Sequence, residues 1–441
     1  MQAINIIWFR RDLRLRDNAG LLYALKSGLP VLPIFIFDEK ILSKLEDKRD
    51  ARVNFLHMEI NKLNDELQKL GSSILVKFGK PENVWKEIIS DYCVDTVFCN
   101  RDYEQYAIER DKTVENLLSQ NGTKLKSFKD QVIFEKREIV KKDGEPYTVF
   151  TPYSRKWKEM LYSRISDNEF YFFKSYPTDK YFSNFLKTEL FKIPTLQEIG
   201  FEPTDIEIPG KEIMQSVVKN YDQNRNFPSV AGTTKLGIHF RFGTISIREK
   251  ARKAIQLNET FLNELIWRDF YAQILANFPQ VEKHSFRSEY DKIQWLNNPE
   301  EFKAWCEGRT GYPLVDAGMR ELNATGFMHN RVRMVVASFL VKHLLIDWKW
   351  GEAYFAKKLL DFDLASNSGG WQWAAGCGTD AAPYFRIFNP ESQTDKFDKE
   401  HKYIKKWVKE FGTAAYPEPI VDHKYARERC LSTFKMALQS L

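Results

Sequence analysis

The chain is poor in the residues and motifs that mark several large protein classes. Its 441 residues include only five cysteines, odd in number and widely spaced, with no CxxC pair, so a disulfide framework is not indicated. The seven histidines form no HExxH motif and no pair at close metal-ligand spacing, so we expect no metal site. No apolar run approaches the roughly 18 to 20 residues that cross a bilayer, and we expect no membrane association.

Two nucleotide-binding motifs and a secretion signal are also missing. Neither GxGxxG nor GxxxxGK[ST] occurs, so a dinucleotide fingerprint and a P-loop are excluded. The apolar start, residues 1–9, is followed at once by Arg10 and Arg11, whereas a signal peptide carries its positive charge before the apolar run. We therefore expect a cytoplasmic protein.

What the sequence does contain is the balance of a folded chain. Hydrophobic residues make up 43% and charged residues 29%, with a formal net charge of +6. This composition excludes wholesale disorder, and the charge permits a nucleic-acid partner without requiring one. Tryptophan is frequent, with eleven residues gathered toward the C-terminal half, a number that a large aromatic core would also explain.

The first 130 residues alternate between two kinds of hydrophobic pattern, one typical of strands and one typical of helices. Apolar runs of strand length are each followed by a segment with helical spacing, and this alternation predicts βαβ units in a parallel sheet. The predicted strands are 3–9, 31–37, 74–78 and 94–99, and the predicted helices are 21–26, 53–70, 81–92 and 104–119. We therefore expect a Rossmann-like α/β domain at residues 1–130.

The rest of the chain divides into a connector and a helical region. Residues 131–209 are rich in Lys, Tyr, Phe and Pro without a sustained period, which predicts a long interdomain connector. From residue 210 to 441 strand patterns almost vanish. Helical spacing recurs at 261–278, 301–305, 315–325, 327–346 and 351–360. The predicted architecture is an α/β domain joined by a long connector to an all-helical domain.

Two segments of the helical region carry side chains that suit a ligand. The loop at 233–237 offers hydroxyls and free backbone N–H groups ahead of a helix, which suits a phosphate. A second segment combines a carboxylate, an indole, a guanidinium and a phenol on one helix face. These residues are Glu264, Trp267, Arg268 and Tyr271. A capped loop and a solvated helix face are the alternative explanations.

Two further segments follow in order. HNRVRM at 329–334 places polar residues at the start of a helix whose continuation is strongly apolar, so we expect a polar cavity there. The segment 361–373 contains two adjacent glycines, which allow close backbone approach to a ligand. Its two tryptophans would lie about 200° apart on a helix, so one can face inward while the other lines a cavity.

Together these segments resemble the photolyase/cryptochrome family. The similarity runs through IIWFRRDLRLRDN at 6–18, GRTGYPLVDAGMREL at 308–322, HNRVRM, DFDLASNSGGWQWAAGCGTDAAPYFRIFNP at 361–390 and KFD at 396–398. In detail the sequence looks like the bacterial class I cyclobutane pyrimidine dimer photolyases. The resemblance implies a deoxyribodipyrimidine photo-lyase whose helical domain holds FAD in a U-shape. Photoexcited reduced FAD would pass an electron to a flipped-out pyrimidine dimer and repair it.

The resemblance also implies which residues bind FAD. They are Tyr221, Thr233, Thr234, Lys235, Leu236, Gly237, Arg333, Asp361, Phe362, Asp363 and Asn367. Among them, Arg333 would pair with Asp361, and Asn367 would face the reactive flavin nitrogen. A neutral amide supports both the anionic and the protonated reduced flavin, whereas the aspartate of plant cryptochromes favours a neutral radical. Lys235 and Gly237 depart from the usual family loop, which puts one phosphate hydrogen bond in doubt.

A lesion pocket and DNA contacts follow from the same resemblance. The residues implied in repair are Glu264, Asn330, Met334 and Asn367, and those implied in DNA binding are Arg225, Glu264, Trp267, Arg268, Tyr271, Asn330, Arg331, Trp373 and Gln393. Enzymes that work on bases, photolyases among them, flip the target into a pocket with apolar walls and hydrogen-bonding groups. Glu264 can share a proton with a carbonyl that gains negative charge. Phosphate contacts would supply most of the affinity and make it salt-sensitive.

Three tryptophans and one cleft match secondary features of the family. Trp295, Trp348 and Trp371 correspond to the electron relay that photoreduces FAD outside the repair step, although each is also explained as a core tryptophan. An antenna chromophore would lie near Arg10, Asp38 and 103–110. Folate-binding relatives carry an Asn-Glu pair where this chain has Tyr106 and Ala107. Folate, deazaflavin, a second flavin or no antenna therefore all remain open.

Three other functions are considered. A 6-4 photoproduct photolyase carries a second histidine close to HNRVRM, where this chain has Asn330 and Met334. A signalling cryptochrome usually has an extended C-terminal tail, which we do not expect here, and Asn367 also disfavours it. The third alternative is a flavin or nucleotide redox enzyme acting on a small molecule. We expect a monomer that binds UV-damaged DNA, single- or double-stranded, and that associates with the bacterial nucleoid when bound.

Overall fold

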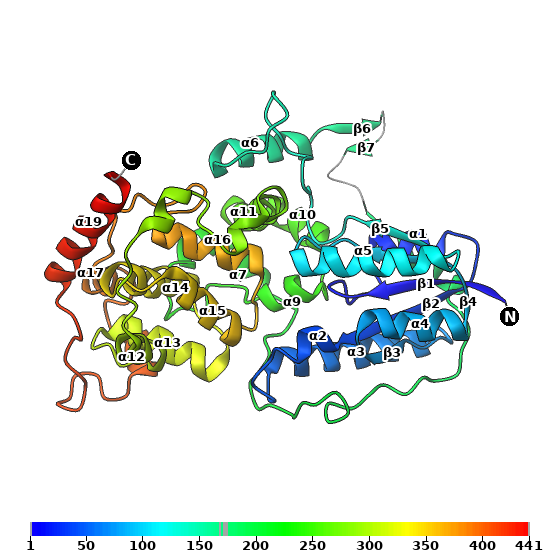
Figure 1. Ribbon diagram of the computed structural model, residues 1–441, viewed down its shortest axis with the longest axis horizontal. Coiled ribbons are helices and arrows are strands. Elements are labelled where there is room, and N and C mark those ends of the chain that lie inside the picture. Colours follow the sequence, from blue (N-terminus) through cyan, green and yellow to red (C-terminus); the bar gives the residue numbers. More distant parts are fainter. Residues whose placement is uncertain (1, 167–168, 171–174, 440–441) are drawn as a thin grey trace. The chain divides into compact units, whose positions relative to one another are not determined.

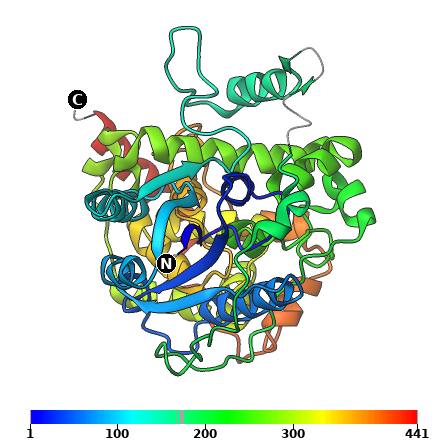
Figure 2. The ribbon, with the colours of Figure 1, turned by 90° about the vertical axis from the view of Figure 1, so that its right-hand side faces the viewer.

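The computed structural model describes residues 2–166, 169–170 and 175–439 and resolves them into two compact units (Figures 1 and 2). The first unit comprises Met1–Glu135, Trp157–Lys211 and Leu236–Lys253, and the second comprises Lys136–Lys156, Glu212–Lys235 and Ala254–Leu441. Neither unit is one continuous stretch of sequence. No described helix is both long enough and apolar enough to cross a membrane.

The first unit is built on a five-stranded parallel sheet with the order β3-β2-β1-β4-β5 (Figure 1). The strands are β1 (Ala3–Phe9), β2 (Val31–Asp38), β3 (Leu75–Gly79), β4 (Cys93–Asn100) and β5 (Lys124–Phe128). The helices between them are α1 (Ala19–Leu25), α2 (Glu39–Leu42), α3 (Ala51–Gln68), α4 (Pro81–Asp91) and α5 (Gln105–Gln120).

Alternate residues of β1 pack against helices on opposite faces of the sheet. Ile7 and Phe9 join a buried cluster with residues of α1 and α3. Ile6 and Trp8 join a second cluster with residues of α4 and α5. Because both faces are covered, the central strands are nearly continuous apolar runs. The predicted four strands and four helices are confirmed, and so is the predicted fold class.

Strand β5 was not predicted from the sequence. It is the edge strand beside β4, and its sequence KLKSF leaves three of five residues exposed. Lysines on an edge strand discourage pairing with another chain. They also remove the apolar run by which the buried strands are recognised.

The second unit is helical, and no strand occurs among the described residues after 210. Its helices include α7 (Gln215–Lys219), α8 (Tyr221–Asn224), α11 (Glu259–Asn277), α12 (Pro299–Glu307), α13 (Pro313–Thr325), α14 (Asn330–Ser338), α15 (Trp348–Lys358), α16 (Leu364–Ala375), α17 (Pro390–Phe397), α18 (Lys402–Trp407) and α19 (His423–Gln439). Helix α16 packs against α11, α14 and α15. It therefore stands at the centre of the residues implied in function.

The predicted helix at 327–346 is shorter and less regular than expected. Helix α14 begins after the N-cap His329, and it passes into a π-helical turn, η5 (Phe339–His343). Single π-turns inside α-helices often occur near functional sites. The apolar run continued through both elements, so the pattern alone did not mark the change in hydrogen bonding.

The predicted connector, 131–209, is divided between the units. Lys136–Lys156 belongs to the second unit, and Trp157–Lys211 belongs to the first. It contains α6 (Phe150–Leu161), the short strands β6 (Arg164–Ser166) and β7 (Glu169–Phe170), and the 3₁₀ helix η2 (Thr178–Asn184). Apart from α6, these elements are too short and too widely separated to give a sustained period. The limits of the three domains remain a prediction.

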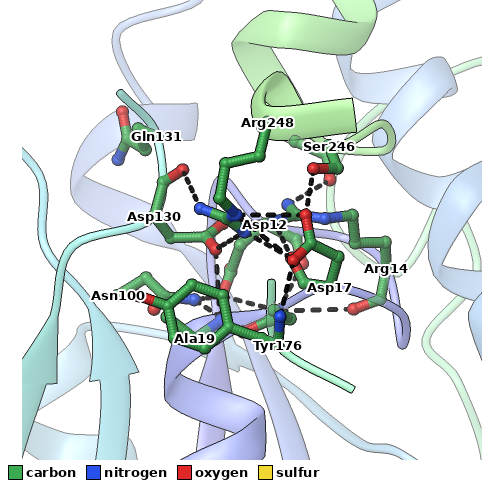
Figure 3. A network of polar contacts seen from close by, with 12 residues as sticks. Asp12, Arg14, Asp17, Ala19, Asn100, Asp130, Gln131, Tyr176, Ser246 and Arg248 are labelled. Atoms are coloured by element: carbon green, nitrogen blue, oxygen red, sulfur yellow. Dashed lines mark hydrogen bonds and ion pairs between the residues drawn. The ribbon is translucent and has the colours of Figure 1, made fainter. Parts of the chain in front are cut away.

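A buried charge network explains why Leu236–Lys253 belongs to the first unit (Figure 3). Asp130 accepts from Arg14 at 2.6 Å and from Arg248, near the start of α10 (Ile247–Leu257), at 2.8 Å. Burial alone would raise the pKa of Asp130, but these two guanidinium groups hold it below its usual value. Arg248 also pairs with Asp17 at 3.0 Å. The charges are therefore satisfied within the unit.

Candidate active site

Helix α11 carries the predicted row of polar and aromatic side chains. It begins after Asn258, whose side chain accepts the N–H of Phe261 and caps the helix. One turn later, Glu264 forms an ion pair with Arg225, the residue after α8. Burial raises the pKa of Glu264, and Arg225 opposes that shift. A carboxyl group whose pKa is raised by burial holds a proton more readily than an exposed one, and can share it with a bound ligand.

Trp267, Arg268 and Tyr271 follow on the same helix, and all three are half-buried. The rings of Trp267 and Tyr271 lie 5.4 Å apart at 31°. Tyr271 packs against Gly369 of α16, where a β-carbon would lie 2.2 Å from the tyrosine ring. The glycine therefore allows α16 to approach α11, which brings two of the predicted segments together.

Tyr221 opens the short helix α8 and lies beside the Glu264–Arg225 pair. The Arg225 guanidinium is 5.5 Å from the centre of the Tyr221 ring, and the Tyr221 and Phe261 rings meet edge to face at 5.2 Å. Burial, followed by the nearby Glu264, raises the pKa of the Tyr221 phenol. Tyr221 is therefore a neutral hydrogen-bonding group in this region.

The loop after α8 turns back tightly at Gly232. A β-carbon on Gly232 would lie 2.5 Å from the β-carbon of Asn224, so only glycine fits this close return. Lys235 takes a left-handed backbone with φ of 52°, and its ammonium lies 4.9 Å from the Phe327 ring centre. Thr233–Lys235 lie in the second unit. Leu236 and Gly237, at the start of α9 (Gly237–Phe242), are assigned to the first unit.

Helix α14 places its first residues next to Arg225. Arg331 donates to the side chain of Asn226 at 2.8 Å and lies 4.3 Å from the Phe397 ring centre. Burial, followed by Arg225, lowers the pKa of Arg331. Asn330 is exposed and Met334 is half-buried. Arg225 and Arg331 thus lie close together, and among the described residues no carboxylate pairs with Arg331, which favours an anionic ligand.

His329 caps α14 and is held neutral. Its Nδ1 accepts the N–H of Arg331 at 3.2 Å, so Nε2 carries the proton. Burial, followed by Arg333 and Arg331, lowers the pKa of His329 to about 4. The Nε2 atom is buried and makes no hydrogen bond within the described chain.

Arg333 and Asp361 form the predicted pair. One nitrogen of the Arg333 guanidinium lies 3.0 Å from each Asp361 oxygen, and Nε donates to the Met328 carbonyl at 2.8 Å. Asp363 caps α16 by accepting the Ser366 N–H at 3.1 Å. The aspartates before α16 are therefore fixed by the helices around them. Phe362, between them, packs at the edge of the main helical core.

Asn367, on the first turns of α16, is oriented by Glu352 of α15. The amide nitrogen donates to the Glu352 carboxylate at 2.8 Å and to its backbone carbonyl at 3.1 Å. Its amide oxygen is thereby left as the acceptor. Burial raises the pKa of Glu352, and the hydrogen bond from Asn367 opposes that shift.

The three tryptophans predicted to form an electron relay lie in the helical core. Trp371 and Trp348 are each 2% exposed, and Trp295 is partly buried. Gly351 of α15 makes room for Trp371, because a β-carbon there would lie 2.1 Å from the indole. The Trp371 ring meets Phe355 at 5.0 Å and Trp305 at 6.1 Å.

Several buried polar atoms in this region lack a hydrogen-bond partner within the described chain. They are Asn263 Oδ1, His329 Nε2, Arg331 Nε and Gln393 Oε1. Buried polar atoms normally find partners, so these atoms fit a region that binds a polar ligand. Gly370 on α16 is exposed, and a β-carbon there would meet no atom within 4 Å. The half-buried Trp373 follows one turn later.

The predicted antenna cleft is lined by groups that pair with one another. Tyr106 donates to Asp38, at the end of β2, at 2.6 Å. Arg10, after β1, pairs with Asp111 at 2.5 Å, and Arg10 and Arg110 both lie over the Trp8 ring. The structure thus brings the predicted cleft residues together. Among the residues it describes, no group of three or more His, Cys, Asp or Glu could hold a metal ion.

Sequence reasoning missed three residues that contact the predicted ones. Glu352 holds Asn367, Asn226 holds Arg331, and Phe150 covers Trp267. Glu352 follows Trp348 by four residues, so helical spacing could have placed it on the face of a predicted relay residue. Phe150 begins α6 and Asn226 lies in the turn after α8, and no local signal identifies them.

Comparison with known proteins identifies the family. Residues 5–169 match the family model described as DNA photolyase, and residues 261–415 match the model described as the FAD binding domain of DNA photolyase. A relative from Agrobacterium fabrum, named deoxyribodipyrimidine photo-lyase, is 36% identical and covers 97% of each chain. The chain belongs to the DNA photolyase family.

Solved structures of photolyases support the same assignment over the whole chain. A class III photolyase from Agrobacterium tumefaciens is 33% identical with a TM-score of 0.86, covering 100% of this chain and 98% of that one. An archaeal photolyase from Sulfolobus tokodaii with two FAD molecules is 34% identical with a TM-score of 0.80, covering 98% and 99%. The predicted resemblance to the photolyase/cryptochrome family is confirmed.

Proposed function

We propose that this chain repairs cyclobutane pyrimidine dimers in UV-damaged DNA in a light-dependent reaction. When bound, reduced FAD would supply an electron to the dimer on excitation by blue light, and would take it back after the ring bonds break. The protein would bind the cofactor and the flipped lesion and stabilise charge. The observation that carries this proposal is the packing of α16 against α11 and α14. It unites the Asn367 helix with the Glu264 and Arg331 helices in a chain of the photolyase family.

The second unit offers polar groups suited to FAD. Arg333 and Asp361 would hold the flavin side, Asp363 the adenine side, and Tyr221 with the Thr233–Lys235 loop the phosphates and ribitol. The partnerless buried atoms of His329 and Asn263 support a polar ligand in this region.

Asn367 would present its amide oxygen to the flavin. The Asn367 amide nitrogen donates twice to Glu352, so the amide oxygen would be able to accept a hydrogen bond from a protonated flavin nitrogen. A neutral amide at this position carries no charge, so it needs no positively charged partner. This argues against the redox preference of a signalling cryptochrome.

Glu264 would share its proton with a pyrimidine carbonyl. Burial raises its pKa, so the protonated form is accessible, while Arg225 keeps the carboxylate form available. A hydrogen bond to an oxygen that gains negative charge stabilises that charge most when it is largest. Glu264 would therefore act during repair more than during binding.

Contacts to DNA would come from Arg225 and Arg331, with Asn330, Met334, Trp267 and Trp373 around the lesion. Arg331 is half-buried and held by Asn226, so little side-chain freedom would be lost when a phosphate binds. Arg268, Tyr271 and Gln393 would add polar contacts, and Tyr271 would do so from its packed position beside Gly369. Neutralised phosphates release counterions, so we expect affinity to fall steeply with salt.

Trp371, Trp348 and Trp295 would carry electrons toward the flavin when FAD is photoreduced. Trp371 is buried beside Trp305 and Phe355, and burial protects an oxidised indole from water. The identity of an antenna chromophore stays open among a folate, a deazaflavin, a second flavin and none. The Tyr106–Asp38 and Arg10–Asp111 contacts lie among the residues that would surround a folate, a deazaflavin or a second flavin.

The direct test is repair of a defined oligonucleotide. FAD-loaded, chemically reduced protein is incubated with a strand containing one thymine dimer, single- or double-stranded, in blue light and in the dark, and the intact strand is measured by chromatography. We expect repair in light only. A parallel strand with a 6-4 photoproduct should stay unrepaired. Repair of neither lesion would contradict the proposal and favour a signalling protein or a small-molecule redox enzyme.

A further inference from the structure

Phe150 lies directly on the face of Trp267. The two ring centres are 3.7 Å apart and the planes are within 2° of parallel. Phe150 also meets Phe270 edge to face at 5.9 Å, and Trp267 meets Phe270 in the same way at 5.6 Å. At this separation no third ring can enter between Phe150 and the indole, so one face of Trp267 is closed.

The segment that carries Phe150 is anchored to the second unit by hydrogen bonds and by packing. The Phe150 N–H donates to the Asp380 carboxylate at 3.3 Å. Gln273, which is 2% exposed, donates to the Tyr147 carbonyl at 2.9 Å. The buried Tyr153 packs on Phe270 with ring centres 5.2 Å apart.

We propose that Phe150 is a positioning residue for the lesion. It holds the Trp267 indole in one orientation, so that the opposite face of the ring is the one presented to a flipped pyrimidine. This inference rests on the proposed function, because it takes Trp267 as a wall of the lesion pocket. It adds a residue from the predicted connector to that wall.

The anchoring decides between two roles for Phe150. A ring that merely fills the lesion's place would have to leave when DNA binds, and its departure would break the contacts to Trp267 and Phe270. A fixed ring loses nothing on binding and reduces the ordering cost, since the indole is already oriented. The contacts of Tyr147, Phe150 and Tyr153 favour the fixed role.

The test compares Phe150→Ala, Phe150→Leu and Phe150→Tyr in the FAD-loaded protein. Dark dissociation constants are measured on a strand with one thymine dimer and on the same strand undamaged. Aromatic pairs contribute about 0.5–1.5 kcal/mol, so we expect Ala and Leu to weaken dimer binding roughly two- to ten-fold. Affinity for the undamaged strand should not change, and Tyr should restore dimer binding. Repair per bound dimer at saturating DNA should stay at the wild-type value.

Phe278→Leu is the matched control, because Phe278 ends α11 and meets Phe286 edge to face at 5.2 Å. It removes one aromatic contact of the same helix away from Trp267. Unchanged dimer binding in the Ala and Leu variants would overturn the inference, and tighter binding would assign Phe150 the displaced role. Failure of the wild-type protein to prefer the dimer would instead contradict the proposed function. The Leu variant keeps the packing volume if the Ala variant does not fold.

Discussion

Buried charges are treated differently in the two units of this protein. In the first unit, Asp130 accepts from Arg14 and Arg248 (Figure 3), and each charge is met by another charge of the chain. In the second unit, the region around Glu264 keeps one ion pair but also has buried polar atoms without partners, such as His329 Nε2. A network whose charges meet one another stabilises the fold, although Arg14 Nε makes no hydrogen bond among the described residues. A network left open suits a ligand, since the ligand completes it.

The first prediction tests the closed network, where the largest effect on stability is expected. Asp130→Asn should lower the free energy of unfolding by about 3–5 kcal/mol, because it leaves two buried guanidinium groups without their common partner. Urea unfolding of the first unit's signal measures the loss. Asp205→Asn is the control, since Asp205 is 98% exposed in its ion pair with Arg49, and it should change stability by less than about 1 kcal/mol. Equal losses of unfolding free energy in the two variants would show that the buried charge network stabilises the first unit no more than an exposed ion pair does.

The second prediction concerns the open region. Glu264→Gln should retain FAD and bind dimer-containing DNA, yet repair it about 100-fold more slowly, because a positioned proton donor is lost. Repair under blue light at saturating DNA measures this change. Glu259→Gln, five residues earlier on the exposed start of the same helix, should repair normally. A Glu264→Gln protein with wild-type repair would remove the proposed role.

The third prediction compares two glycines that face different surroundings. Gly351→Ala should cost about 1–3 kcal/mol through overpacking against Trp371, and it should slow photoreduction of FAD. Trp371→Phe should block that photoreduction while repair by chemically reduced protein continues. Both are followed by flavin absorbance under illumination.

Gly370→Ala provides the counterpart, because a methyl group there meets no atom of the chain. The FAD-free protein should gain up to about 1 kcal/mol of helix stability. If FAD occupancy falls in spite of this gain, the methyl group meets the cofactor. Unchanged FAD occupancy would show that the cofactor does not contact this face of α16.

A modest effect is expected in the pH dependence of stability. The pKa of His329 is lowered to about 4 in the folded protein from about 6.5 in the unfolded chain. The unfolded state therefore binds more protons between these values, and stability falls as the pH drops from about 6.5 to 4. His329→Asn keeps a capping residue that does not titrate. Between pH 7.5 and 5.5 it should lose about 1.4 kcal/mol less stability than the wild type in urea unfolding. An identical pH profile would show that His329 is not held neutral.

The contrast between the units also describes how well each could be predicted. In the first unit, the buried strands were found because each is a short apolar run next to a helical period. In this sheet the edge strand β5 was missed, since its lysines face water. In the second unit, helical spacing correctly placed Glu264 and Trp267 on one helix. It could not pair Glu264 with Arg225, because that contact spans 39 residues of sequence.

By itself the sequence determined the fold class, the family and the residues of each helix face, because periodicity and motif identity are local properties of the chain. The tertiary structure alone decided which faces meet. It joined Glu352 to Asn367, brought Phe150 from the predicted connector onto Trp267, and left His329 Nε2 buried with no hydrogen-bond partner in the part of the chain that the structure describes. These outcomes depend on long-range packing between elements, where side-chain shape and the need to satisfy buried polar atoms act together. No local pattern records such contacts.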